Sequence, residues 1–260
     1  MVASKVVLQK IINNRICAIM AHGKSIEKLE NKITDLKKYD ICWTSLSVFN
    51  IMEEFILSKI NKHLDIVFDC ATVPDSLKEN YEKNVRLPRL AEFLERNENN
   101  LWITTFGIER DTLRSLNNNW FLAKFQHKIF IVDYIFPKLK RGFYMDVPNS
   151  ICLLIAALLY GGAKKIILFG FDGCTKKDNN IDTYYKPEYH KKEHLVAIGK
   201  VGNTALYRDT LDFQQRFPIL LDHYRKLFNN NAEIINCSPN SFYTVIRRIT
   251  YEELEQCLTT

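Results

Sequence analysis

Two glycine-containing turns carry the residues best suited to chemistry on an anionic ligand. His22-Gly23-Lys24-Ser25 follows the short apolar run Ile16 to Ala21, and apolar residues at helical spacing come after it. This pattern predicts a strand, a turn and a helix that Ser25 caps, with backbone N–H groups left for an anion. A plain strand-to-helix turn is an equally good interpretation, because neither the Walker pattern nor G-x-G-x-x-G is present.

The second turn, Gly170-Phe171-Asp172-Gly173, follows a predicted strand at Lys164 to Phe169, in which two lysines precede the wholly apolar run Ile166 to Phe169. A wholly apolar run of this length is typical of a central strand in a parallel sheet that is covered on both faces. Such sheets bind ligands beyond the carboxyl ends of their strands. We therefore expect an active site to lie beside Gly170 and Asp172.

A buried helix is expected to precede that strand. Ser150 is a good N-cap, the residues from Ile151 to Tyr160 are apolar on all sides, and Gly161 and Gly162 end the run. The sequence thus places Asn149 and Ser150 at a helix N-terminus, where backbone N–H groups favour an anion.

Ser45 and Asp69 also follow apolar runs that predict strands. The first predicted strand covers Asp40 to Trp43 and ends at Thr44-Ser45, and the second covers Asp65 to Phe68. Repeated units of strand, polar residue and helix predict an α/β fold with a doubly wound, mostly parallel, Rossmann-like sheet. One edge of that sheet would collect Gly23, Ser25, Ser45 and Asp69.

The polar segment 174–203 contains tyrosines and histidines but little apolar periodicity. We interpret it as a lid, in which Tyr184 and Tyr185 donate to a leaving phosphate and His190 or His194 takes a proton near neutral pH. Solvated surface histidines are the alternative. His190 and His194 have the spacing of a zinc-binding pair, yet no third ligand is evident, so no metal site is expected.

The remaining elements are expected from apolar pattern and turn residues. Asn203 to Phe228 predicts a long helix, interrupted or started afresh at Pro218, and Ser241 is expected to cap a short helix. Further strands are predicted at Leu101 to Phe106, Ile129 to Ile135 and Glu233 to Asn236, turns at Asn97 to Asn100 and Asn117 to Asn119, and a surface helix at Tyr251 to Thr260.

Composition limits the class of protein. The chain has 260 residues, a formal net charge of +6 and seven cysteines. We expect one domain over 1–260, reduced thiols and a cytoplasmic location, with no signal peptide. No apolar run is long enough to cross a bilayer, so any contact with the inner face of a membrane would be peripheral. The lysines are scattered among acids, which argues against nucleic acid as a partner.

Three segments together resemble a known superfamily. Its branches are bacterial lipooligosaccharide sialyltransferases, flagellin nonulosonate glycosyltransferases and 6-hydroxymethylpterin diphosphokinase-like proteins. Their shared pattern is G-x-G-P-S-L, a later Ser or Thr-Ser opening an apolar helix, then a glycine, a short strand and G-x-D. The similar segments here are AHGKSIEKL (Ala21 to Leu29), NSICLLIAALLYGGAKKIILFGFDG (Asn149 to Gly173) and INCSPNS (Ile235 to Ser241), and residues 72–146 are unmatched.

The resemblance implies a role for each matching position. Gly23 and Ser25 would approach nucleotide phosphates, and Ser45 and Asp69 would lie beside the nucleotide sugar. The other positions are the following: Asn149 and Ser150 touch the donor, Asp172 is the aspartate of G-x-D, Tyr184 and Tyr185 stabilise the departing phosphate, and His190 or His194 is the general base.

The implied activity is that of a sialyltransferase-like glycosyltransferase. It would transfer a nonulosonic acid such as sialic acid from a CMP-activated donor to a glycan or glycolipid acceptor, in lipopolysaccharide biosynthesis, without a cofactor. Lys24, Ser45, Val147 and Cys174 depart from the pattern of the sialyltransferases. Two alternatives stay open: a diphosphokinase with magnesium on Asp69 and Asp172, and a non-catalytic nucleotide-binding module.

Overall fold

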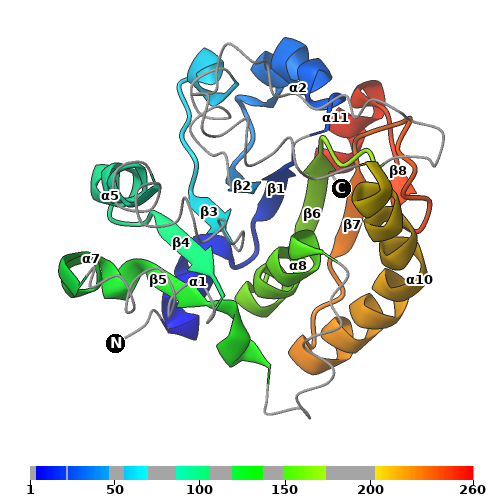
Figure 1. The fold of residues 1–260 in the computed structure, drawn as a ribbon. Helices are drawn as coiled ribbons and strands as arrows, with labels where there is room; N and C mark the ends of the chain where they lie inside the picture. Colours follow the sequence, from blue (N-terminus) through cyan, green and yellow to red (C-terminus); the bar gives the residue numbers. More distant parts are fainter. Residues whose placement is uncertain are drawn as a thin grey trace.

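A computed structural model describes residues 4–21, 23–46, 56–69, 86–105, 119–136, 149–173 and 203–259. Within these residues, eight strands form one sheet in the order β5-β4-β3-β2-β1-β6-β7-β8, and every neighbouring pair is parallel. Figure 1 shows β5 and β8 at opposite edges of the sheet. The strands are β1 (Ile16–Met20), β2 (Ile41–Leu46), β3 (Ile66–Asp69), β4 (Leu101–Thr104), β5 (Ile129–Ile131), β6 (Lys165–Phe169), β7 (Glu233–Asn236) and β8 (Arg247–Arg248).

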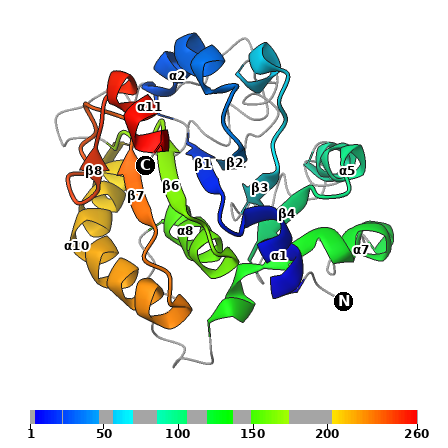
Figure 2. The ribbon, with the colours of Figure 1, turned by 180° about the vertical axis from the view of Figure 1, so that it is seen from behind.

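Helices cover both faces of this sheet (Figures 1 and 2), as expected for a doubly wound α/β fold. The buried apolar residues of α1, α8 and α10 pack on one face, and those of α2, α5, α7 and α11 pack on the other. The helices are α1 (Lys5–Ile12), α2 (Ile26–Lys32), α5 (Leu87–Arg96), α7 (Asn119–Phe125), α8 (Ser150–Gly161), α10 (Asn203–Phe228) and α11 (Tyr251–Thr259).

In strand β6, burial on both faces explains the unbroken apolar run Ile166 to Phe169. Ile166 and Leu168 belong to the core on the α8 face, whereas Ile167 and Phe169 belong to the core on the α2 face, and all four are fully buried. Successive side chains of a strand point to opposite faces, so a strand covered twice needs apolar residues at every position.

The direction of winding reverses at the centre of the sheet. From β1 the chain moves outward through β2, β3 and β4 to β5, and it then returns to place β6 on the free side of β1. Ile16 accordingly pairs with Ile41 of β2 on one side and with Lys165 of β6 on the other. The turns after β1 and β6 therefore meet at the switch point of the fold, where open α/β sheets bind their ligands.

The structure corrects three expectations about local elements. Helix α10 continues through Pro218, with Phe217 and Leu220 buried against the α8 side of the core, so tertiary packing overrides the missing backbone donor. Residue Asn149, not Ser150, is the N-cap of α8, since its backbone is extended and Ser150 is already helical. Ser241 caps no helix, because a turn and β8 follow it.

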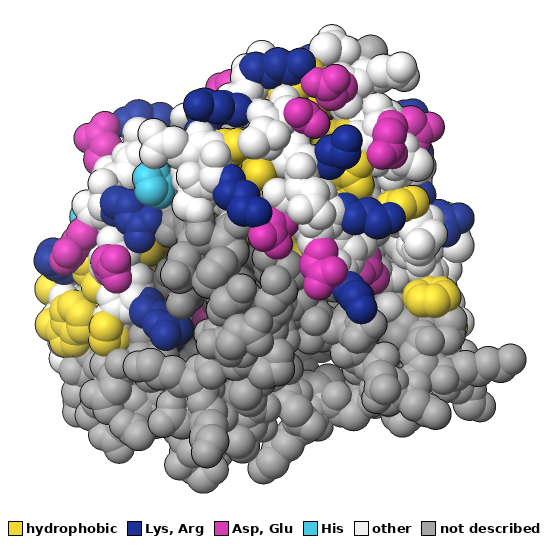
Figure 3. Space-filling model, turned by 90° about the horizontal axis from the view of Figure 1, so that it is seen from above, with side chains coloured by type: hydrophobic (Ala, Val, Ile, Leu, Met, Phe, Trp, Pro, Cys, Tyr) yellow, Lys and Arg dark blue, Asp and Glu magenta, His cyan; other side chains and the backbone are white. Residues whose placement is uncertain are grey.

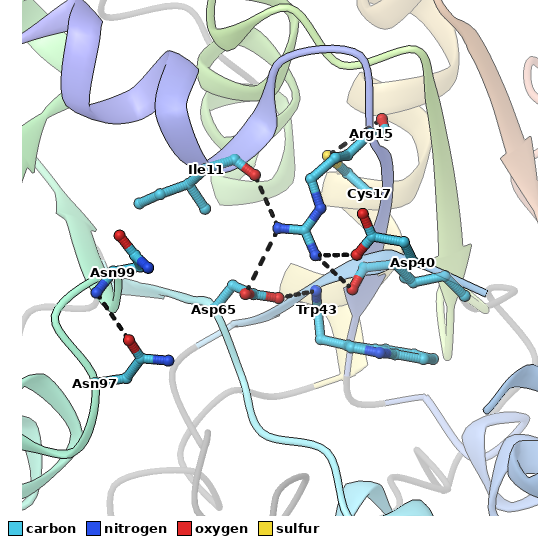
Figure 4. Close-up of polar contacts among 9 residues, drawn as sticks. Ile11, Arg15, Cys17, Asp40, Trp43, Asp65, Asn97 and Asn99 are labelled. Atoms are coloured by element: carbon cyan, nitrogen blue, oxygen red, sulfur yellow. Dashed lines mark hydrogen bonds and ion pairs between the residues drawn. The ribbon is translucent and has the colours of Figure 1, made fainter. Parts of the chain in front are cut away.

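A network of hydrogen bonds and ion pairs around Arg15 connects residues at the amino ends of β2 and β3 (Figure 4). The guanidinium of Arg15 lies 2.8 Å from Asp40 Oδ1 and 3.6 Å from Asp65 Oδ1, and it donates to the carbonyl of Ile11 at 2.9 Å. Asp65 Oδ2 also accepts the backbone N–H of Trp43 at 2.9 Å. This network joins the end of α1 to the starts of β2 and β3.

The described surface carries charges of both signs. In the view of Figure 3, Lys and Arg side chains are interspersed with Asp and Glu side chains over the described part of the face. None of the described helices combines the length and the apolar character that crossing a bilayer requires. Five described cysteines are buried and free, namely Cys17, Cys42, Cys152, Cys237 and Cys257.

Candidate functional site

The turns after β1 and β6 are joined through their backbones. The N–H of Ala21 donates to the carbonyl of Phe169 at 2.8 Å, and the N–H of Gly23 donates to the carbonyl of Gly170 at 2.7 Å. A Cβ at Gly23 would lie 2.5 Å from the Gly170 carbonyl oxygen and 2.5 Å from Asp172 Oδ2. Gly170 has a φ of 68°, which favours glycine. Both glycines are therefore required for the close approach of the two turns.

Asp172 binds the start of helix α2. Its Oδ2 accepts the backbone N–H of Ser25 at 2.9 Å, and its Oδ1 accepts the Ser25 hydroxyl. Ser25 makes no side-chain capping bond to its own helix. A carboxylate is favourable at a helix N-terminus, so Asp172 takes the place that we expected an external anion to fill. The Ser25 N–H is not free, contrary to the sequence-based expectation.

Ser238 extends this contact into a directed chain of hydroxyl groups. Its Oγ lies 2.7 Å from Ser25 Oγ and accepts the backbone N–H of Phe171 at 3.2 Å. The single proton of Ser25 is donated to the Asp172 carboxylate, which leaves Ser238 as the donor to Ser25. The chain runs from Phe171 N–H through Ser238 and Ser25 to Asp172.

Tyr251 brings α11 to the same cluster. Its hydroxyl donates to the carbonyl of Ser25 at 3.3 Å. Burial raises the pKa of Tyr251, and the phenol stays neutral and remains a donor. The Ser25, Asp172 and Ser238 cluster thus joins the ends of β1, β6 and β7 to the last described helix. Sequence reasoning did not assign a role to Ser238, although it lies in the quoted segment INCSPNS directly beyond β7.

Two further polar side chains fix the turn that carries Asp172. Asn236 Nδ2 and Ser241 Oγ both donate to the carbonyl of Phe171, at 2.9 and 2.8 Å. Both residues are buried. The turn after β6 is therefore held by groups from the end of β7 and from the loop beyond it.

Helix α8 presents its N-terminus at the same edge of the sheet. Its last residue is four positions from the start of β6, so the 12-residue helix runs back along the strands from their carboxyl edge. The Asn149 side chain makes no capping hydrogen bond, and its Oδ1 accepts the Cys152 thiol at 3.4 Å instead. Burial raises the pKa of Cys152 to about 12, so this thiol stays protonated and can donate. Asn149 and Ser150 are half-buried.

Ser45 and Asp69 are buried within or at the end of their strands. Ser45 is 0 % exposed. Asp69 is 4 % exposed, and its Oδ2 lies 3.0 Å from Arg86 Nε. Asp69 ends β3, whereas the Asp172 carboxylate binds Ser25 in the turn after β1. Strands β3 and β1 are two strand spacings apart, about 10 Å. A single magnesium ion binds oxygens at about 2.1 Å, so Asp69 and Asp172 are too far apart to share one.

Four of the site residues predicted from the sequence lie outside the residues that the structure describes. They are Tyr184, Tyr185, His190 and His194. In the parts of the chain that are described, no three His, Cys, Asp or Glu side chains are grouped as metal ligands.

Comparisons with known proteins give no relative for this chain. No protein-family model matches it, and no curated protein or solved structure matches it significantly. The resemblance to the sialyltransferase superfamily therefore depends on the quoted segments, and any functional assignment depends on the geometry of this edge.

Two helix N-termini at this edge differ in their capping. Asp172 binds the N-terminus of α2, whereas the N-terminus of α8 receives no hydrogen bond from the side chain of its own cap residue, Asn149. The carboxylate of Asp172 neutralises the start of α2 and would repel another anion there. The start of α8 has no acidic residue in its first turn and no side-chain cap from Asn149. This arrangement suits one anionic group, placed at α8 and not at α2.

Proposed function

We propose that the protein is a glycosyltransferase that takes a sugar from a CMP-activated donor and transfers it to a glycan or glycolipid. The observation that carries the proposal is the meeting of Gly23, Ser25, Gly170 and Asp172 at the switch point between β1 and β6. Ligands of open α/β sheets bind at this point. The nonulosonic acid donor is inferred from the resemblance of the three quoted segments.

The phosphate of the donor is assigned to the N-terminus of α8, beside Asn149 and Ser150. Backbone N–H groups at a helix N-terminus stabilise negative charge, including charge that develops on a leaving group. A CMP leaving group carries one phosphate, and of the two helix N-termini described above only that of α8 has no carboxylate bound to it. A diphosphate would place more charge against Asp172 and would call for magnesium ligands.

The buried ion pair of Asp69 with Arg86 further disfavours the diphosphokinase alternative. The Asp69 carboxylate is paired with Arg86, and the Asp172 carboxylate accepts hydrogen bonds from Ser25. Releasing either carboxylate for a metal would break contacts that keep a half-buried or buried charge satisfied. Metal-independent departure of CMP is therefore the proposed chemistry.

The acceptor base is proposed to come from the segment that follows Gly173. A Cβ at Gly173 would lie 3.1 Å from Thr210 Cγ2, so the described residues on either side of 174–202 meet at the carboxyl edge. His190 or His194 would deprotonate the acceptor hydroxyl, and Tyr184 and Tyr185 would donate to the departing phosphate. All four roles are proposals from the sequence.

Thermal unfolding with nucleotides tests the binding step. CMP and CMP-sialic acid should raise the Tm without magnesium, because both would bind only the native state. UMP, AMP and ATP with magnesium are the comparison ligands. A rise with ATP and magnesium, and none with CMP, would reverse the assignment in favour of phosphoryl transfer.

Turnover separates an enzyme from a binding module. CMP release from CMP-sialic acid should fall by at least about 100-fold in a variant with both His190→Ala and His194→Ala, a typical effect of removing a general base. CMP binding should persist in that variant. A His63→Ala variant, at an exposed histidine just before the amino end of β3, is the control. Binding of CMP-sialic acid without any turnover in the wild type would contradict the enzymatic part of the proposal.

A further inference from the structure

A polar groove lies at the amino edge of the sheet, opposite the proposed donor site. Its volume is about 410 Å³, within the range of roughly 300 to 1,000 Å³ that is usual for small-molecule sites. The groove is formed by one side of α1, by the end of α8 and its connection to β6, and by the end of α10 and the turn after it. The lining residues used below are Lys5, Gln9, Tyr160, Lys164, Asn229 and Asn231.

The charge of the groove is positive. Lys5 and Lys164 are the only charged side chains among the described residues that line it, and none of these lining residues is Asp or Glu. Both lysines are exposed. An anionic group that entered the groove would therefore meet the ammonium groups of Lys5 and Lys164, and the described lining residues contribute no carboxylate.

Three carbonyls at and just beyond the end of α8 already accept hydrogen bonds. Asn230 Nδ2 donates to the carbonyls of Leu159 and Ala163 at 2.9 and 3.1 Å. The N–H groups of Gly162 and Asn14 bind the carbonyls of Leu159 and Gly162. These bonds occupy the carbonyl of Leu159 in the last turn of α8 and the carbonyls of Gly162 and Ala163 just beyond the helix. An anion in the groove would therefore face fewer unpaired acceptors.

An aromatic side chain and several amides complete the lining. The ammonium of Lys5 lies 4.5 Å from the centre of the Tyr160 ring, and that ring packs edge-on against Phe228 with centroids 5.3 Å apart. Gln9, Asn229 and Asn231 add amide groups that both donate and accept hydrogen bonds. Such a lining suits a ligand with many hydroxyl groups on a partly apolar ring.

We propose that this groove binds an anionic saccharide, meaning a sugar that bears a carboxylate or a phosphate. The two lysines bind the charged group, the amides bind the hydroxyl groups, and Tyr160 contacts the sugar ring. Helix α8 is about 18 Å long, so this site is distinct from the switch point at the other edge. The proposal stands independently of the glycosyltransferase assignment.

Calorimetric titration with simple sugars tests the proposal. N-acetylneuraminic acid or glucose 6-phosphate should bind the wild type, with glucose and inorganic phosphate at least ten-fold weaker. The double variant Lys5→Gln, Lys164→Gln should lose at least ten-fold in affinity, and Gln9→Ala should weaken binding less. The matched control is Lys10→Gln, Lys62→Gln, which removes two exposed lysines outside the groove and should bind as the wild type does.

The outcomes distinguish this groove from the donor site. CMP binding that is unchanged in the Lys5 and Lys164 variant would support separate sites, whatever the result for the sugars. Absence of binding by both charged sugars, or equal losses in the groove and control variants, would overturn the proposal. Inorganic phosphate binding as tightly as glucose 6-phosphate would also overturn it, since the groove would then recognise only the anion.

Discussion

The Ser25 hydroxyl and backbone N–H both donate to the carboxylate of Asp172, across 147 residues of sequence. This contact lies at the point where the sheet reverses its winding, and it decides which helix N-terminus is left for a ligand. It also explains why a glycine precedes Ser25 by two positions: a Cβ at Gly23 would collide with Asp172.

Replacing Asp172 should destabilise the protein. Asp172→Ala leaves the N–H and hydroxyl of Ser25 without their acceptor, which should lower the free energy of unfolding by about 1 to 3 kcal/mol. Ser25→Ala removes the hydroxyl contacts with Asp172 and Ser238 but keeps the backbone N–H bond to Asp172, so it should cost less, roughly 1 kcal/mol. Urea unfolding of both single variants and the double variant measures the coupling, which should exceed about 0.5 kcal/mol. Additive losses, or losses no larger than in an Asp222→Ala control on the exposed side of α10, would show that the contact adds nothing.

Gly23→Ala and Gly161→Ala should differ in their cost. At Gly23 the new Cβ would lie 2.5 Å from a backbone oxygen and from the Asp172 carboxylate, so the two turns must separate. At Gly161 the nearest atom is the Cδ1 of Ile12, at 2.8 Å, and the end of a side chain can move more easily. We expect Gly23→Ala to cost several kcal/mol, since overpacking alone costs about 1 to 3 kcal/mol. Thermal unfolding of the two variants compares them, and a smaller loss for Gly23→Ala would contradict the interlocked turns.

The pH dependence of stability should reveal the buried Asp65. Burial raises the pKa of Asp65, and the charges of Arg15 and the Trp43 N–H only partly offset this effect. The folded protein therefore binds the proton more tightly than the unfolded chain does. The stability that this preference contributes is full below about pH 4, the usual pKa of an unfolded aspartate, and is lost as the pH rises through the folded pKa.

Asp65→Asn imitates the protonated side chain and should remove this dependence. The free energy of unfolding of the wild type, minus that of the variant, should decrease as the pH rises from about 4. Urea unfolding at several pH values gives this difference, with Asp222→Asn as the exposed control. A difference that increases with pH would mean that the ion pair with Arg15 outweighs burial.

The sequence predicted the central strands well because each contains an unbroken run of apolar residues. The run Glu233 to Asn236 matches β7, and the runs for β1, β2, β3 and β6 differ from the structure by a few residues at most. Helix α5 was missed although its buried residues follow a helical spacing and Pro88 lies in its first turn, a common position for proline. Helix α1 and the two-residue strand β8 were also missed, since each is short and α1 lacks a side-chain cap.

The candidate site was predictable only in part. Local pattern placed Gly23, Ser25, Gly170 and Asp172 at the carboxyl ends of strands, and the parallel pairing of β1 with β6 brings them together. Local pattern could not show that Asp172 binds Ser25, because the partners of a hydrogen bond between distant turns depend on strand order. Ser238 was passed over for the same reason, as its role follows from the position of β7 beside β6.

Hydrogen–deuterium exchange with and without CMP tests the central claim most directly. The account predicts that CMP slows exchange in peptides that cover 149–156 and 19–29, at the start of α8 and at the turn after β1. Peptides that cover 5–14 and 226–232, at the amino edge, should exchange as before. Slower exchange confined to the amino edge, or no change at saturating CMP, would contradict a nucleotide site at the switch point.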